Sequence, residues 1–196
     1  MTQDKGGEMM FQRLRARTGL FAPRPAARAG QALYAPVMAQ ARLPVFYLAG
    51  RVADTPTGRF ELAVLHLALI ERRLRGGDAF TAEAGQALFD AFLSGLDDGL
   101  RELGVGDLTV PKTMRRLAEA VYGRFKGLDA ALAATDPTAL PELLGRTVYA
   151  GADPRPVAAL AAYVRAADAA LTALSLEAVF GESLPWPTPE FEGEAA

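Results

Sequence analysis

Apolar residues recur at helical spacing along most of the chain. Leucine and phenylalanine return every three or four positions after Thr81, and a second stripe follows beyond a glycine-containing turn. This spacing predicts amphipathic helices, and no segment alternates polar and apolar residues convincingly enough to predict a strand. The first stripe consists of Leu88, Phe92, Leu96, Leu100 and Leu103, and the second of Met114, Leu117, Ala118, Val121, Tyr122 and Phe125. We therefore expect an all-α, single-domain multi-helix bundle.

One segment differs from these stripes because it is apolar on almost every side. Residues 60–74 read FELAVLHLALIERRL, with few polar side chains before Glu71. Such a helix is surrounded by others rather than lying on a surface, so we predict a buried central helix here. Thr55 or Thr57 is suited to cap it, and Pro56 is suited to its first turn. Gly76 and Gly77 are expected to end it.

The remaining elements follow from capping and helix-breaking residues. The sequence predicts a helix from Ala29 to Arg42 that Pro36 kinks or restarts, and then a connection from Leu43 to Thr57. Thr81 is expected to cap the helix that carries the first stripe. Further helices are expected near Thr138–Tyr149, after Asp136 and Pro137, and from Val157 to Phe180, after Asp153 and Pro154 and before Gly181.

The apolar segment from Val157 to Phe180 is also a candidate membrane span. Arg165 and Asp168 lie near its middle, where each costs about 2.5–3.5 kcal/mol in a bilayer. Their i, i+3 spacing allows them to pair on one helix face. A core helix with one polar side is therefore the better interpretation.

The turn between the two stripes, Gly104 to Asp107, has the sequence GVGD. Gly104 occupies the position of a left-handed helix cap, and the turn is expected to fold the two stripes against each other. A phosphate-binding loop is a weak alternative, because the turn follows a helix, lacks the later glycine of the dinucleotide motif and contains a carboxylate.

Charge is distributed unevenly along the chain. No acidic residue lies between Glu8 and Asp54, whereas seven arginines do, and after Arg165 there are six acidic residues and no basic one. We predict a basic, flexible arm at residues 1–28, a helical domain at 29–181 and an acidic, proline-rich tail at 182–196. The arm is either solvated or in contact with an anionic membrane surface. The net charge of -2 argues against nucleic acid as a partner.

Residues that carry chemistry are sparse. The chain has no cysteine and one histidine, His66, which lies in the most apolar segment and is expected to be a hydrogen-bonded core residue. Asp97 and Asp98 resemble part of a metal-binding cluster, but Asp97 can pair with Arg101 four residues later. We therefore assign no catalytic, metal-binding or cofactor-binding residue, and we do not expect an enzyme.

Four segments in the same order resemble the ubiquinol-cytochrome c chaperone family in its short, bacterial form. The likeness extends over residues 34–176, and the combination of the motifs GRFE, LH, DD, LRE, GVGD and YGR is far more specific than any one of them. The segments are QARLPVFY at 40–47, DTPTGRFELAVLHL at 54–67, LFDAFLSGLDDGLRELGVGDLTVPK at 88–112 and AVYGR at 120–124.

The resemblance implies an all-helical chaperone without enzymatic activity that supports assembly of the cytochrome bc1 complex. Its client would be newly synthesised cytochrome b, and its place the cytoplasm, peripheral to the inner face of the inner membrane. In mitochondria, family members work with a small partner chaperone near the ribosome. The resemblance does not imply that this shorter protein needs either the partner or the ribosome.

The family motifs and the proline turn supply a candidate client-binding set. For the polar members, a structural ion pair or helix cap is an equal alternative, and Phe46 and Tyr47 fit a core as well as a groove. The set is Phe46, Tyr47, Arg59, Glu61, Asp97, Arg101, Asp107 and Arg124.

Two other function classes remain open from the sequence. One is a helical membrane-surface adaptor without a specific client, which would bind anionic lipid through the arginines from Arg13 to Arg28. The other is a helical enzyme that processes a lipid or isoprenoid, which would need a cluster of metal-binding carboxylates.

Overall fold

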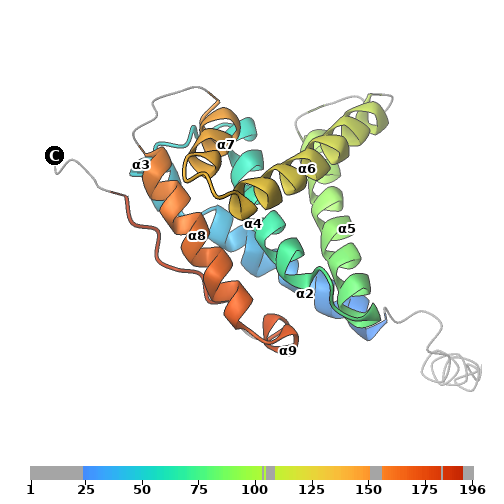
Figure 1. Ribbon diagram of the computed structural model, residues 1–196. Coiled ribbons are helices and arrows are strands. Elements are labelled where there is room, and N and C mark those ends of the chain that lie inside the picture. Colours follow the sequence, from blue (N-terminus) through green and yellow to red (C-terminus); the bar gives the residue numbers. More distant parts are fainter. Residues whose placement is uncertain (1–23, 103, 105–108, 151–155, 182, 192–196) are drawn as a thin grey trace, which may run out of the picture.

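The computed structural model describes residues 24–102, 104, 109–150, 156–181 and 183–191. These residues form helices joined by short connections, with no strand among them, which confirms the predicted all-α bundle (Figure 1). The helices are α2 (Pro25–Ala41), α3 (Pro44–Leu48), α4 (Pro56–Leu74), α5 (Ala79–Glu102), α6 (Val110–Ala133), α7 (Ala139–Thr147), α8 (Val157–Ala173) and α9 (Leu176–Val179). None of these helices is both long enough and apolar enough to cross a bilayer.

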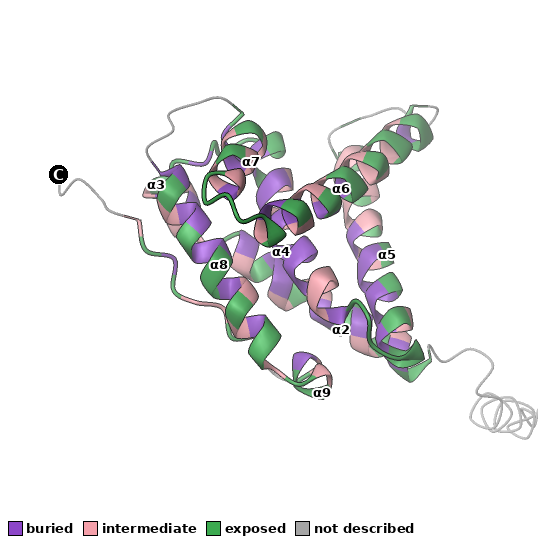
Figure 2. Ribbon diagram, in the orientation of Figure 1, coloured by how far each residue is buried: buried purple, intermediate pink, exposed green. Residues whose placement is uncertain are grey.

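Helix α4 is the buried central helix that the sequence predicts. More than half of its residues are buried, and it contacts α2, α5, α6 and α8 (Figure 2). Thr55 caps its start by accepting a hydrogen bond from the Gly58 amide at 3.2 Å, and Pro56 occupies the first turn, as expected. Gly76, with φ of 81°, follows its last residues.

Helix α2 packs closely along α5, and Gly30 allows this approach. A Cβ atom at Gly30 would lie 2.0 Å from the carbonyl oxygen of Ala84, so any larger residue would force the two helices apart. Helix α2 begins at Pro25, four residues before the predicted start at Ala29, and it runs through Pro36 without a restart.

Two local predictions are corrected by the structure. The predicted connection after Leu43 contains the short helix α3, which begins at Pro44. The cap of α5 is Asp78, whose carboxylate accepts a hydrogen bond from the Thr81 amide at 2.9 Å, rather than Thr81 itself. Asp136 accepts similarly from the Thr138 amide before α7, whereas Asp153 and Pro154 lie outside the described residues.

The predicted helix from Val157 to Phe180 is divided into α8 and α9. Leu174 adopts an extended backbone, and the Ser175 hydroxyl accepts a hydrogen bond from the Ala178 amide to cap α9. The Arg73 side chain donates to the carbonyl oxygens of Leu171 and Leu174 at this break, and the Leu171 oxygen also accepts from the Leu174 amide. A long-range arginine contact therefore stabilises the end of α8.

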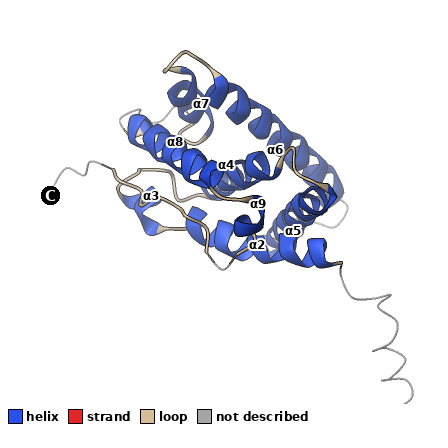
Figure 3. Ribbon diagram, turned by 60° about the horizontal axis from the view of Figure 1, so that its bottom comes forward, coloured by secondary structure: helices blue, strands red, loops and turns tan. Residues whose placement is uncertain are grey.

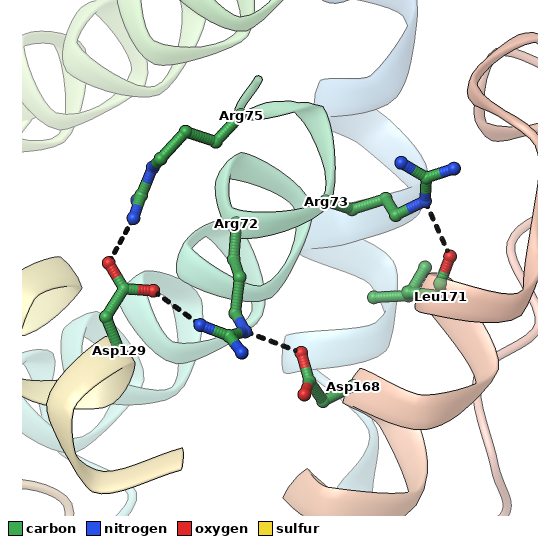
Figure 4. A network of polar contacts seen from close by, with 6 residues as sticks. All are labelled: Arg72, Arg73, Arg75, Asp129, Asp168 and Leu171. Carbon is green, nitrogen blue, oxygen red and sulfur yellow. Dashed lines mark hydrogen bonds and ion pairs between the residues drawn. The ribbon is translucent and has the colours of Figure 1, made fainter. Parts of the chain in front are cut away.

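Ion pairs join the C-terminal half of α4 to α6 and α8 (Figure 4). Arg72 lies between Asp129 of α6, at 3.1 Å, and Asp168 of α8, at 2.9 Å, while Arg75 also binds Asp129. The predicted pairing of Asp168 with Arg165 is therefore wrong, because the carboxylate turns inward to α4. The network fixes how α6 and α8 lie on the central helix.

The two stripes of α5 and α6 pack together over only part of their length. Figure 1 shows the helices close at the turn that joins them and diverging toward the body, and α6 packs more extensively on α4 than on α5. Gly104 has φ of 77°, which confirms its predicted left-handed conformation, whereas residues 105–108 lie outside the described residues. The apolar residues Leu96, Leu100, Met114 and Leu117, in the parts of the two helices nearest the turn, are only partly buried.

The segment 183–191 is extended and returns along α8 toward α3 (Figures 1 and 3). The Trp186 ring lies 5.3 Å from the His66 ring, and the Phe191 ring lies 6.0 Å from the Phe46 ring, both edge to face. These contacts make Trp186 and Phe191 a part of the packed body.

His66 is fully buried and hydrogen-bonded, which confirms its predicted core role. Its Nδ1 donates to the Leu62 carbonyl oxygen at 2.8 Å, so Nε2 accepts from the Tyr163 hydroxyl, also at 2.8 Å. That hydroxyl in turn accepts from the Gln40 amide at 3.0 Å. The chain of bonds requires a neutral imidazole, and burial lowers the pKa of His66 to about 4.

Stability is expected to fall as the pH drops from 7 to 5. The unfolded chain binds a proton at His66 below its ordinary pKa of 6.5, whereas the folded protein does not until about pH 4. This difference removes about 2 kcal/mol from the free energy of unfolding over that range.

Urea unfolding at pH 7, 6 and 5 measures this loss, and the same series on His66→Gln should show a shallower dependence. An NMR titration of the single imidazole in the folded protein gives an independent readout. A titration midpoint near 6.5 would contradict the assignment.

Candidate functional site

The candidate client-binding residues do not form one site. They divide among the core, an ion pair between helices, a surface cluster near α3 and the outer part of α5. Phe46 and Tyr47 lie on α3, Arg59 and Glu61 on α4, Asp97 and Arg101 on α5, and Arg124 on α6, while Asp107 lies outside the described residues.

Phe46 is a core residue. Its side chain has no exposed surface, and its ring packs edge to face against His66 at 5.4 Å and Tyr163 at 5.1 Å. Phe46 is therefore not accessible to a partner in the folded protein. Apolarity beside a proline turn is compatible with either a core or a groove, and the structure places this ring in the core.

Glu61 and Arg124 form a bidentate ion pair between α4 and α6. The guanidinium donates to the two carboxylate oxygens at 2.9 and 2.7 Å, and Glu61 is only 6% exposed. This bonding holds the pKa of Arg124 above its usual value. A hollow of about 20 Å³ beside the pair is large enough for one water molecule. The geometry is that of a structural clamp.

Tyr47 and Arg59 belong to a polar cluster at the surface. Arg59 binds the Asp54 carboxylate at 2.5 and 3.1 Å, and its guanidinium carbon lies 5.9 Å from the centre of the Tyr47 ring. The Tyr47 hydroxyl donates to the Ala41 carbonyl oxygen at 3.0 Å. Hydrogen bonding from Arg59 lowers the pKa of Asp54, and burial raises the pKa of Tyr47.

This cluster borders a groove between α2, α4 and α5. The groove has a volume of about 230 Å³ and a largely apolar lining, with Arg42 and Arg59 among its polar residues. We call it the α2/α4/α5 groove. Its main apolar side chains are Tyr34, Met38, Phe60, Ala63, Phe92 and Leu96.

Sequence reasoning did not identify this groove. The spacing of Phe92 and Leu96 predicts helix packing, since an apolar stripe has the same pattern whether or not a neighbouring helix covers it completely. Phe60 was assigned to the central helix for the same reason. The proximity of these residues to Tyr34 and Met38 depends on how α2 lies along α5, which the pattern does not specify.

Asp97 and Arg101 form the predicted i, i+4 ion pair on α5, at 2.8 Å. Neither residue lines the groove: Asp97 directly follows Leu96, the last α5 residue in its lining, and Arg101 lies about one turn beyond Asp97. Within the described part of the chain, no three His, Asp or Glu side chains gather closely enough to hold a metal ion. The groove instead offers apolar contact beside positive charge.

Comparisons with known proteins connect these features to a family. The family model described as ubiquinol-cytochrome C chaperone matches residues 49–186, a range that includes Arg59, Glu61 and Arg124 but begins after Tyr47. A comparison with curated proteins found no match.

A solved structure described as the Cbp3 homolog from Brucella abortus is similar in both sequence and fold. It is 34% identical, the alignment covers 88% of this chain and 92% of that one, and the TM-score is 0.72. The identity, the coverage and the family match agree with the resemblance carried by the GRFE, GVGD and YGR motifs. The chain therefore belongs to the ubiquinol-cytochrome c chaperone family.

Proposed function

We propose that this protein is a chaperone that binds newly synthesised cytochrome b and holds it during assembly of the bc1 complex. The family match over residues 49–186 is the observation that carries the proposal. Family membership supports a role in bc1 assembly, and the identity of the client is the step that we add. The role requires binding and release and no covalent chemistry.

The α2/α4/α5 groove supplies a physical means of holding an apolar client. A newly made membrane protein exposes apolar helices, and such a helix binds in a groove through packing complementarity alone. Arg42 and Arg59 at the groove can donate hydrogen bonds to carbonyl groups at the end of a client helix, where positive charge is favourable. The Tyr47 ring helps to hold the Arg59 guanidinium in place through a cation–π contact.

The same proposal assigns different roles to the remaining candidates. Glu61 and Arg124 hold α6 on α4 and so maintain the body that carries the groove. Asp97 and Arg101, in the C-terminal part of α5, form a second, polar contact with the client, together with Asp107, which lies outside the described residues. The protein works in the cytoplasm at the inner face of the membrane, where the basic arm of residues 1–28 adds attraction to anionic lipid.

Deletion of the gene in its native host tests the function. We expect cytochrome b and assembled bc1 complex to fall well below wild-type levels, because unassembled cytochrome b loses its protection. Spectroscopy of haem b and native gels measure the two quantities, and a plasmid copy of the gene should restore both. Normal amounts of haem-loaded bc1 complex in the deletion strain would refute the role.

A pair of substitutions separates contact from scaffold. Arg124→Ala leaves the buried Glu61 carboxylate without its partner and should cost about 3 kcal/mol of folding free energy. Arg59→Ala removes only an exposed pair, so its melting temperature should match the wild type.

Capture of cytochrome b by affinity-tagged chaperone provides the second readout. Arg59→Ala together with Leu96→Asp should reduce capture while the protein remains folded. Unchanged capture by this folded double variant would exclude the α2/α4/α5 groove as the binding surface.

A further inference from the structure

Residues of α4, α5 and α6 line another hollow. In Figure 1, α5 and α6 diverge toward α4. The volume of the hollow is about 400 Å³, larger than that of the α2/α4/α5 groove. We call it the α4/α5/α6 cleft. An acidic side chain from α4, aromatic rings from α5 and α6, and several polar side chains line it. They include Glu71, Arg75, Gln86, Phe89, Tyr122 and Lys126.

Glu71 is the unusual group in this cleft. Its Oε1 atom is buried and has no hydrogen-bond partner among the described residues. Burial raises the pKa of the Glu71 carboxyl, and the nearby Arg75 partly offsets the rise. An unpartnered buried carboxylate is unfavourable, so a hydrogen bond or ion pair from a ligand to this group would be stabilising.

Gly85 of α5 lies beside this carboxyl group. A Cβ atom at Gly85 would lie 3.4 Å from one Glu71 oxygen and 3.5 Å from the other, which is ordinary van der Waals contact. A longer side chain at this position would therefore compete with a ligand for the space next to the carboxyl group.

Three aromatic rings lie next to the carboxyl group in the same cleft. The Phe89 ring centre is 5.0 Å from that of Tyr122 and 6.3 Å from that of Phe125, and the latter two are 6.2 Å apart. Tyr122, from the YGR motif, is 51% exposed although it belongs to the apolar stripe. Aromatic faces attract cations and also pack against the alkyl stem of a basic side chain.

The other charged groups of the cleft already have partners or point to solvent. Asp129 is bound by Arg72 and Arg75, and the Gln86 amide donates to Asp90 at 2.7 Å. Lys126 is exposed at the rim. Glu71 is thus the one carboxylate lining the described cleft that has no cationic partner within ion-pair distance, while Arg75 and Lys126 can donate to backbone carbonyls of a guest.

We propose that the α4/α5/α6 cleft binds a lysine or arginine side chain of a polypeptide, flanked by apolar residues. The cationic head pairs with Glu71, and the alkyl stem lies against Phe89 and Tyr122. The choice of a polypeptide rests on the proposed chaperone function, whereas the choice of a cation rests on the carboxylate and the rings.

Synthetic peptides test the cleft with the full-length protein. One peptide has a single lysine between leucine pairs, and its match has norleucine, which keeps the stem without the charge. Calorimetry should show the lysine peptide binding at least about tenfold more tightly, the effect of one charge-assisted bond. Glu71→Gln should abolish this preference, Tyr122→Ala should weaken binding of both peptides, and Glu142→Gln on α7 should change neither.

Glu71→Gln is expected to fold at least as well as the wild type, since it removes an unpartnered charge, and thermal unfolding checks this. Equal affinity for the two peptides, or a lysine preference that persists in folded Glu71→Gln, would overturn the proposal. If the protein binds phosphatidylethanolamine vesicles through Glu71 but shows no preference between the peptides, the ligand of the cleft is not a polypeptide.

Capture of cytochrome b separates this proposal from the proposed function. If the wild type captures cytochrome b and Glu71→Gln captures less, both the chaperone function and the role of the cleft are supported. Equal capture by the two proteins would reject the cleft as a client site and leave the chaperone function intact. No capture by the wild type, together with the expected peptide results, would reject the client and retain the cleft as a cation site.

Discussion

The burial of α4 is the constraint on which the rest of the structure depends. A helix that is apolar on nearly all sides must be covered by several neighbours, and α2, α5, α6 and α8 provide that cover. Its few polar side chains then need partners from the covering helices. Glu61 forms an ion pair with Arg124 of α6, and His66 accepts a hydrogen bond from Tyr163 of α8. Arg72 forms ion pairs with Asp129 of α6 and Asp168 of α8. These contacts set the positions of α6 and α8 along α4.

The surfaces available to a partner lie where this cover is incomplete. Toward the start of α4, the α2/α4/α5 groove exposes apolar side chains beside two arginines, and toward its end the α4/α5/α6 cleft exposes a carboxylate and aromatic rings. One surface suits an apolar helix and the other a basic side chain. A membrane protein with apolar helices and basic loops presents both, so a rigid helical body with two such hollows can bind it without chemistry.

Much of the fold could be predicted from local signals, but the site could not. Periodicity located the main helices, and the capping pattern of Thr55 and Pro56 identified the start of α4 within its local sequence. Helix α3 has five residues, too few for a periodic pattern, and the break at Leu174 depends on Arg73, distant in sequence. Asp168 had a plausible local partner in Arg165, and only the packing of α8 on α4 selects Arg72 instead. Both hollows likewise arise from helix arrangement, which residue spacing does not encode.

Site-specific photo-crosslinking in cells that are making cytochrome b tests the central claim most directly. A photoreactive amino acid at Ala63, in the α2/α4/α5 groove, is compared with one at Glu142, on the exposed side of α7. The account predicts a crosslink to newly made cytochrome b from position 63 and none from position 142. Crosslinks from position 142 alone, or none to cytochrome b from either, would contradict it.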